Sequence, residues 1–432
     1  MSNLLIRGGR VVCPASGFDS EPADVLILGG AIVAAGPGAG ASAPPDIQVL
    51  DASGLVVCPG FIDLHVHLRE PGREDKETIA TGTRAAAAGG FTSIFCIPNT
   101  DPVLDSATGL HYVLSRAAAA GMVNVFPYAS VTKGQLGEEI VEFGDLVASG
   151  ARGFTDDGRP VMNSETMRRA LEYSAMFGVP VLDHCEDAPM AHGGVMHEGA
   201  VSLRLGLKGI PAIAESVQVA RDVELAAATG GHIHIMHVSK KESLGPIRAG
   251  KARGVKVTAE VTPHHLCLTD ELLAEFDTLA KVNPPLGGAD DRAALREALL
   301  DGTIDCISTD HAPHTDIEKD FPINDAPFGM VGLETAFPLL NTELVRTGAV
   351  PSLTWLIERM TAAPARVIGL APRGSLAAGA PGDVTVLDPD AEVTVTRDFL
   401  KGKSRNTPLM GRKLHGAIRA TVVSGRVVWE NR

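Results

Sequence analysis

The chain has 432 residues, of which 45% are hydrophobic and 21% charged, close to average globular usage. Fifty-two acidic residues against 38 basic ones give a net charge of −14, which argues against non-specific binding to nucleic acid or to a membrane surface. No apolar run approaches the ~18 residues of a membrane span, and the first residues lack a secretory signal pattern. The six cysteines are scattered without a C-x-x-C pair. We therefore expect buried thiols and a soluble, cytoplasmic protein.

Short alternating strands separated by Gly/Pro turns occupy both ends of the chain. They are expected at Asn3–Ile6, Arg10–Cys13, Asp24–Leu28, Ala31–Ala35, Asp383–Leu387, Glu392–Thr396, Ala417–Val423 and Arg426–Trp429. Neither end has enough strands for a core of its own. The pattern predicts one small β-sandwich domain built from both termini, residues 1–58 and 369–432.

The middle of the chain, residues 59–368, alternates apolar strand runs with Ala-rich helical segments. Strands are expected at Gly60–Leu68, Thr92–Pro98, Asn124–Val131, Ala151–Asp156, Pro180–His184, His232–Val238, Lys256–Val261 and Asp305–Thr309. Helices are expected at Thr78–Ala88, Gly109–Ala120, Ser164–Phe177 and Ala214–Thr229. This alternation predicts an α/β fold, a (β/α)8 TIM-type barrel, with its chemistry at the C-terminal ends of the strands. A doubly wound open sheet is the alternative, because periodicity does not distinguish a closed sheet from an open one.

Candidate metal ligands stand at the ends of several predicted strands. The first strand ends in His65-Val66-His67, and side chains two apart on a strand project from the same face. Later strands end in Asp157, His184, His237 and Asp310. Four imidazoles and two carboxylates exceed what one Zn²⁺ requires, which indicates two metals that share a bridge such as Asp157. Asp310 could accept a proton from the activated water and donate it to a leaving nitrogen.

Alternation along the strands separates these candidates from their neighbours. Ile233 and Ile235 share a face with His237, and that face suits the barrel core. His232 and His234 are therefore interpreted as structural histidines that point to the surrounding helices. Three aspartates near the strand ends are interpreted as caps or loop solubilisers: Asp156, Asp183 and Asp187.

Four sequence blocks resemble the dihydroorotase family of the amidohydrolase superfamily. They are Pro59–Gly72, which contains His-Val-His-Leu-Arg, Gly153–Gly158, Ser308–His314 and Ala326–Glu334. The resemblance covers essentially the whole chain. It implies a zinc-dependent cyclic amidohydrolase that carries out the reversible cyclisation of N-carbamoyl-L-aspartate to L-dihydroorotate plus water in pyrimidine synthesis.

The resemblance also implies a role for each matching residue. His65, His67 and Asp310 would hold one zinc ion, and His184 and His237 the other, with Asp157 between them. The residues implied in substrate binding are His67, Arg69, Asn99, Asn283, His314, Phe328 and Gly329. Among these, Arg69 would bind the substrate carboxylate with help from Asn99 and His314, because a guanidinium is the natural bidentate partner of a carboxylate.

Many cyclic amidohydrolases bridge their metals with a carboxylated lysine from the fourth strand. The predicted fourth strand contains no lysine, which favours Asp157 as the bridge and weakens a hydantoinase, dihydropyrimidinase or allantoinase interpretation. Whether one or two zinc ions bind is left open by the resemblance.

Two alternatives to this enzyme stay open. One is another cyclic-amide hydrolase. The other is a non-catalytic scaffold, because the family includes inactive homologues that are partners of aspartate transcarbamoylase. Such homologues have lost metal ligands, whereas all six positions are filled here. We expect a small-molecule substrate and a homodimer, and an association with aspartate transcarbamoylase is left open.

Overall fold

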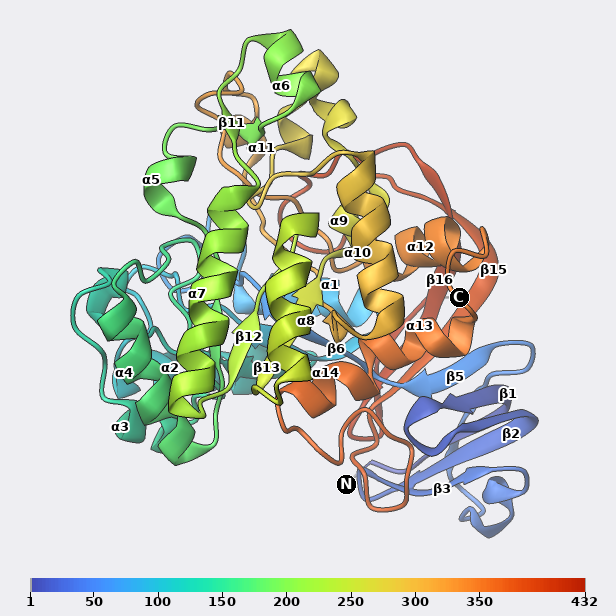
Figure 1. Ribbon diagram of the computed structural model, residues 1–432. Coiled ribbons are helices and arrows are strands. Elements are labelled where there is room, and N and C mark those ends of the chain that lie inside the picture. Colours follow the sequence, from blue (N-terminus) through green and yellow to red (C-terminus); the bar gives the residue numbers. More distant parts are fainter. Residues whose placement is uncertain (1, 432) are drawn as a thin grey trace.

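Strands from both ends of the chain form one sheet in the computed structural model, which describes residues 2–431. Figure 1 shows the N-terminal strands in blue next to the C-terminal strands in red. The strands are β1 (Leu4–Cys13), β2 (Phe18–Leu28), β3 (Ala31–Gly36), β4 (Gln48–Asp51), β5 (Val56–Pro59), β15 (Val384–Thr394), β16 (Lys413–Val423) and β17 (Arg426–Glu430). Their order is β17-β16-β15-β5-β1-β2-β3, with β4 paired to β1.

The two ends of the chain meet where β15 runs antiparallel to β5, with Val384 opposite Pro59. Side chains from both ends, such as Val25 and Val422, are buried in one apolar cluster. The sequence did not indicate the short strands β4 and β5, and it divided β15 into two strands. That this sheet folds over into a two-layered sandwich stays a prediction.

The middle of the chain contains two smaller sheets whose strands run parallel. One consists of β6 (Phe61–Val66), β7 (Phe91–Cys96) and β8 (Asn124–Pro127), and the other of β9 (Val181–Asp183), β12 (Ile233–Ile235), β13 (Val257–Val261) and β14 (Cys306–Ile307). Isolated parallel bridges join Phe154 to Ala129 and Val181, and Val66 to His311. The strand expected at Ala151–Asp156 is thus reduced to the bridges at Phe154. Two residues each form β10 (Met196–His197) and β11 (Gly209–Ile210).

Helices alternate with these strands and cover them on the outside. They are α1 (Ile79–Ala88), α2 (Ala107–Ala120), α3 (Phe143–Ala148), α4 (Ser164–Phe177), α5 (Ala188–Ala191), α6 (Ala200–Leu205), α7 (Ile213–Thr229), α8 (Leu244–Ala252), α9 (Pro263–Cys267), α10 (Ala289–Asp301), α11 (Asp316–Lys319), α12 (Ala336–Leu340), α13 (Leu353–Met360) and α14 (Ala362–Val367). The expected helix at Ser164–Phe177 is confirmed with its bounds, and α1, α2 and α7 begin within two residues of the expected positions. Figure 1 shows α7 and α8 in front of β12 and β13.

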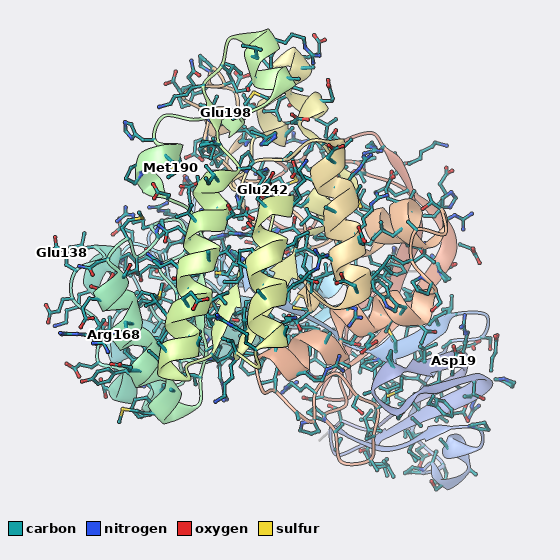
Figure 2. All side chains as sticks on the ribbon, in the orientation of Figure 1. Asp19, Glu138, Arg168, Met190, Glu198 and Glu242 are labelled. Carbon is teal, nitrogen blue, oxygen red and sulfur yellow. The ribbon has the colours of Figure 1, made fainter. Side chains whose placement is uncertain are left out.

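Helices α4 and α7 are amphipathic, so they bury one face and expose the other. Val219 and Val223 of α7 belong to the same core cluster as Ile235 of β12. On the outer face of α4, Arg168 (labelled in Figure 2) pairs with Glu165 at 2.8 Å. Exposed pairs of this kind each add at most about 1 kcal/mol to stability. Within residues 2–431, no helix is long and apolar enough to cross a membrane.

Candidate active site and metal centre

Six candidate metal ligands lie together at one edge of the two parallel sheets. They follow different strands: His65 and His67 come from β6 and the residue after it, Asp157 follows the bridge at Phe154, His184 follows β9, His237 follows β12, and Asp310 follows β14. None of the six is more than 6% exposed. Parallel strands bring their C-terminal ends to the same edge of a sheet, so side chains far apart in the sequence become neighbours there.

His65, His67 and Asp310 form the first group. The Nε2 atom of His67 lies 3.1 Å from Oδ1 of Asp310, and Nε2 of His65 lies 3.4 Å from the same oxygen. One ligand atom from each of the three residues lies within 4.8 Å of the others. The structure thus brings together the three residues that the family resemblance assigns to one metal.

Asp157 lies between this group and the two remaining histidines. Its Oδ1 atom is 3.7 Å from Nε2 of His65 and 3.5 Å from both Nδ1 of His184 and Nε2 of His237. Its Oδ2 atom is 3.6 Å from Nε2 of His67. The facing nitrogens of His184 and His237 are 2.9 Å apart. Both oxygens of one carboxylate therefore face imidazole nitrogens from several strands, as a bridging ligand requires.

The donor atoms of this cluster suit a divalent cation. Nε2 of His65 is buried without a hydrogen-bond partner, although it faces the carboxylates of Asp157 and Asp310. A buried polar nitrogen without a partner is costly, and a bound cation would remove that cost. Imidazole nitrogens together with carboxylate oxygens are ligands that zinc accepts.

Burial and charge act in opposite directions on the pKa values of the cluster. Burial favours the neutral acid of Asp157, but the neighbouring imidazoles outweigh it and hold the pKa of Asp157 well below its usual range. Burial lowers the pKa of His65, but the charges of Asp310 and Asp157 outweigh it and raise the pKa well above its usual value. A cation must displace a proton from such an imidazole, so metal affinity falls as the pH falls.

The backbone is left-handed at three residues of the site other than glycine. The φ angles are 62° at Arg69, 31° at His237 and 49° at Asp310. Residues other than glycine adopt this region rarely, at a cost of about 1–3 kcal/mol each. Each of these residues follows the end of a strand, so the unusual backbone redirects its side chain at the edge where the ligands meet.

The alternation expected along His232–His237 is wrong. Ile235 belongs to the core cluster between strand and helix, whereas His234 lies on the other face, with Nε2 3.2 Å from Oε2 of Glu260. Strand β12 ends at Ile235, and the left-handed backbone at His237 then interrupts the alternation. His237 therefore reaches the ligand cluster although Ile235 faces the helices.

His232 and His234 are nevertheless structural histidines. Nε2 of His232 and Nδ1 of His234 each lie 2.8 Å from the hydroxyl oxygen of Thr258. Within residues 2–431, neither histidine belongs to a group with metal-ligand spacing.

The interpretation of three aspartates as caps or solubilisers holds for one of them. Asp187 is the N-cap of α5 and accepts a hydrogen bond from the backbone N–H of Met190. Asp156 is instead buried and accepts hydrogen bonds from the backbone N–H groups of Val131 and Thr132. These buried hydrogen bonds hold the backbone in place next to Asp157.

Asp183 is also buried and belongs to another group with metal-ligand spacing, together with Cys185 and Asp222. The thiol of Cys185 lies 3.5 Å from Asp183 and 3.6 Å from Asp222. The guanidinium of Arg221 lies 2.7 Å from Asp222, so a cation is already present in this group.

A cavity of about 350 Å³ opens over the ligand cluster. The predicted site residues that line it are His67, Arg69, Asn99, Asp157, His184, His237, Asn283, Asp310, His314, Phe328 and Gly329. His65 is the remaining predicted site residue and is fully buried. The structure thus gathers the predicted metal and substrate residues around one cavity.

Arg69 supplies a positive charge to this cavity. It is 6% exposed, its Nε donates to the carbonyl oxygen of Pro313 at 3.2 Å, and its Nη2 lies 3.3 Å from Nε2 of His314. Burial lowers the pKa of Arg69 to about 10, so the side chain stays charged at neutral pH. Burial and the charge of Arg69 both lower the pKa of His314. A buried guanidinium on a cavity wall is suited to bind a carboxylate.

Two amides on the cavity wall contact candidate metal ligands. Oδ1 of Asn99 lies 3.1 Å from Nδ1 of His67, and Nδ2 of Asn283 lies 3.4 Å from Nε2 of His184. Oδ1 of Asn283 is buried without a partner. Besides the expected contacts with substrate, the amides therefore orient imidazoles of the cluster.

Two buried carboxylates that support the cluster were missed by the sequence analysis. Oε1 of Glu260 on β13 accepts a hydrogen bond from Nδ1 of His65 at 3.0 Å. Asp63 on β6 accepts hydrogen bonds from the hydroxyl and the N–H of Thr309, at 2.6 and 3.1 Å, and so fixes the chain before Asp310. The available signal was a carboxylate within a strand that is mostly apolar.

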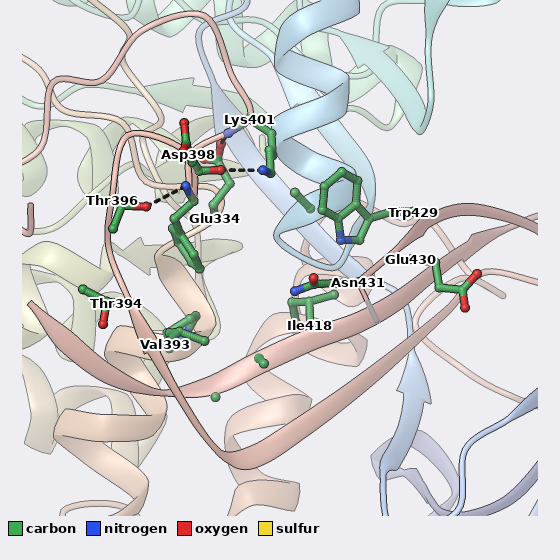
Figure 3. A pocket seen from close by; sticks show the side chains of 15 residues that line it. Glu334, Val393, Thr394, Thr396, Asp398, Lys401, Ile418, Trp429, Glu430 and Asn431 are labelled. Carbon is green, nitrogen blue, oxygen red and sulfur yellow. Dashed lines mark hydrogen bonds between the residues drawn. The ribbon is translucent and has the colours of Figure 1, made fainter. Parts of the chain in front are cut away.

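A second cavity, of about 430 Å³, lies between residues 393–401 and the strands β16 and β17. Figure 3 shows it, with Trp429 and Ile418 on its wall and the Lys401 ammonium donating to the carbonyl oxygen of Asp398. None of the predicted site residues lines this cavity. The candidate chemistry therefore belongs to the cavity over the histidines and aspartates.

Histidines and aspartates at the ends of parallel strands, in this α/β fold, define the class of the amidohydrolases. The sequence matches the Amidohydrolase family over residues 157–429. The fold resembles that of an L-hydantoinase (dihydropyrimidinase) from Arthrobacter aurescens, with a TM-score of 0.88 at 24% identity over 100% of this chain and 96% of that one. It also resembles a D-hydantoinase (dihydropyrimidinase) from a Thermus species, with a TM-score of 0.81 at 26% identity over 98% and 94%.

The relatives in sequence identify the family more narrowly than the fold does. Residues 54–243 match the Dihydro-orotase-like family. A dihydroorotase of Pelotomaculum thermopropionicum is 54% identical over 99% of both chains, and one of Geobacter metallireducens is 51% identical over 99% of this chain and 100% of its own. A dihydroorotase of Anaeromyxobacter dehalogenans is 53% identical over 99% of this chain and 98% of its own. The chain belongs to the dihydroorotase family and is a cyclic amidohydrolase.

Proposed function

We propose that this enzyme catalyses the reversible cyclisation of N-carbamoyl-L-aspartate to L-dihydroorotate plus water, a step of pyrimidine synthesis. The observation that carries the proposal is the buried guanidinium of Arg69 on the wall of the cavity over the metal-ligand cluster. Both reactants are anions, and a fixed positive charge favours a ring that carries a carboxylate over a neutral cyclic amide. The dihydroorotases that share 51–54% of the sequence support the same substrate.

The proposed metal is zinc. His65, His67 and Asp310 would hold one ion, and His184 and His237 a second, with Asp157 between them. Bound zinc would acidify a water molecule and polarise the reacting carbonyl group. The short distance between the facing nitrogens of His184 and His237 supports their joint use as ligands.

In the hydrolytic direction, water adds to the ring carbonyl carbon and the bond from that carbon to nitrogen breaks. The leaving nitrogen needs a proton, and the water loses one. Asp310 is proposed to carry that proton. Its Oδ1 faces His65 and His67, so we assign the proton to Oδ2. In the direction of ring closure the same oxygen takes the proton from the attacking nitrogen and returns it to the departing water.

Substrate binding is proposed to use two groups of residues on the cavity wall. Arg69, Asn99 and His314 would hold the carboxylate, next to His67. Asn283, Phe328 and Gly329 would contact the ring. The unpartnered Oδ1 of Asn283 supports this role, because a ring N–H group could donate a hydrogen bond to it.

The organisation of the chain is part of the proposal. We propose a closed (β/α)8 barrel over residues 59–368, supported by the parallel bridges at Phe154 and Val66, and a β-sandwich domain from residues 1–58 and 369–432. Six buried, unpaired cysteines support a cytoplasmic enzyme. A homodimer and an association with aspartate transcarbamoylase rest on the family resemblance alone, and light scattering with and without the transcarbamoylase tests both.

Metal analysis combined with a substrate comparison tests the proposed function. We expect one or two zinc ions per chain, loss of turnover after chelation, and recovery when zinc is restored. The value of kcat/KM for L-dihydroorotate should exceed those for dihydrouracil and hydantoin. A purified, zinc-loaded enzyme that prefers the neutral rings would overturn the proposed substrate.

A further inference from the structure

Asn406, in the C-terminal segment between β15 and β16, is bonded to both walls of the substrate cavity. Its Nδ2 donates to the carbonyl oxygens of Ala312 at 3.0 Å and of Gly329 at 3.1 Å. Its Oδ1 accepts a hydrogen bond from the backbone N–H of His314 at 3.0 Å. The residue is 1% exposed, so one buried amide joins the segment that carries His314 to the segment that carries Gly329.

These two segments approach each other more closely than side chains allow. At Gly329, where φ is +131°, a Cβ atom would lie 2.8 Å from Cβ of Ala312 and 3.2 Å from the ring of His314. Only glycine fits this approach without displacing the other wall. The spacing of the two walls is therefore fixed tightly, and the amide of Asn406 is placed to hold it.

Two buried lysines also contact this wall. Nζ of Lys281 donates to the carbonyl oxygen of Ala326 at 2.6 Å and lies 4.5 Å from the ring centre of Phe328. Nζ of Lys319 donates to the carbonyl oxygens of Pro327 at 2.9 Å and of Gly329 at 3.0 Å. These bonds fix the wall that carries Phe328, but they do not reach the segment of His314. The backbone N–H of Ala312 donates directly to the carbonyl oxygen of Met330 at 2.9 Å, and Asn406 adds side-chain hydrogen bonds to both segments.

We infer that Asn406 is a positioning residue for substrate binding, which sets the spacing between the carboxylate-binding wall at His314 and the ring-binding wall at Gly329. The inference rests on the proposed function. Within residues 2–431, no side-chain hydrogen bond joins Asn406 to any of the six metal ligands. Its loss should therefore weaken binding of substrate while the metal is retained.

The test uses Asn406→Asp in the full-length, zinc-loaded enzyme. Aspartate keeps an acceptor for the N–H of His314, but it places a carboxylate oxygen against two carbonyl oxygens. We expect KM for L-dihydroorotate to rise about 10-fold, which corresponds to ~1.4 kcal/mol and to the order of one buried hydrogen bond. The value of kcat should change less than about threefold, because the variant loses an interaction that supports the bound substrate and the transition state equally. The zinc content should not change.

The chain offers a matched control. Asn341 is also 1% exposed, and its Nδ2 donates to the carbonyl oxygens of Pro389 at 2.8 Å and of His415 at 2.9 Å. Asn341→Asp places the same charge between two carbonyl groups away from the cavity. It should lower the melting temperature in a similar way and leave KM at the wild-type value.

Asn406→Ala keeps the test decisive if the aspartate variant does not fold, because it removes the same bonds without adding a charge. It should raise KM in the same direction. An unchanged KM in a folded Asn406 variant would overturn the inference, as would an equal rise of KM in Asn341→Asp. Failure of the proposed function has a different signature: the wild-type enzyme itself would not turn over L-dihydroorotate, and the substrate-positioning role would fall with it.

Discussion

Nδ1 of His65 lies 3.0 Å from Oε1 of Glu260, and both side chains are fully buried. Glu260 also accepts a hydrogen bond from the hydroxyl of Ser308 at 2.5 Å. Burial favours the neutral form of Glu260, but the imidazoles of His234 and His65 outweigh it and lower its pKa. The ionised carboxylate holds a proton on Nδ1 of His65, and this leaves Nε2 free to face Asp157 and Asp310.

This pair predicts that Glu260→Gln weakens metal binding at the first group. A glutamine does not hold the proton on Nδ1 as a carboxylate does, and the loss of such a partner typically costs 10- to 100-fold in metal affinity. Competition with a chromophoric chelator measures the affinity. Glu215 is a control, since this buried glutamate accepts hydrogen bonds from the hydroxyls of Ser239 and Ser243. Equal zinc affinity in Glu260→Gln and Glu215→Gln would contradict the role of Glu260.

Asp310→Asn separates ligation from proton transfer. Asparagine keeps one oxygen ligand but does not take up a proton, so turnover should fall by at least ~100-fold, the lower range for general acid–base catalysis. Zinc content and kcat are measured on the same preparation. Full activity with zinc retained would remove Asp310 from proton transfer.

Arg69→Met tests the basis of substrate choice. A charge-assisted hydrogen bond contributes about 1.5–3 kcal/mol, so kcat/KM for L-dihydroorotate should fall about 10- to 150-fold. The zinc content should stay close to that of the wild type. Activity on dihydrouracil should start low and should not fall in parallel, since that ring carries no carboxylate. An equal loss on both substrates would show that Arg69 supports the site in general, and not the carboxylate in particular.

His232 predicts a specific loss of stability in acid. Burial, together with the positive charges of His234 and Lys256, lowers the pKa of His232 from 6.5 to about 4. Between these two pH values the unfolded chain binds a proton that the folded chain does not, so the free energy of unfolding falls as the pH falls. At pH 4.5 this loss is about 2–3 kcal/mol. His232→Gln should remove that part of the pH dependence, as measured by urea unfolding of both proteins at pH 7.5 and 4.5. Parallel pH dependence in the two proteins would contradict the prediction.

Local patterns in the sequence were sufficient for the helices and for most strands of the middle region. The Ser164–Phe177 helix has an apolar face of its own, and it lies between the N-cap Asn163 and the left-handed Gly178. The candidate ligands were found because each follows an apolar strand run, and strands of one parallel sheet end at one edge. The resemblance to the dihydroorotase family added the roles of Arg69 and His314, which no local pattern indicates.

Tertiary structure decided what depends on partners distant in the sequence. Strand β4 forms because it pairs with β1, and its four residues, two polar and two apolar, do not alternate as a half-buried strand would. The expected alternation placed His234 on the wrong face because a left-handed backbone at His237 interrupts the alternation. Such a backbone angle is set by the packing around the residue. Asn406 carries no sequence signal, since its partners at Ala312 and Gly329 are backbone carbonyl groups. Side-chain type therefore determined which groups are available for the chemistry, and long-range packing decided their neighbours and the direction in which they point.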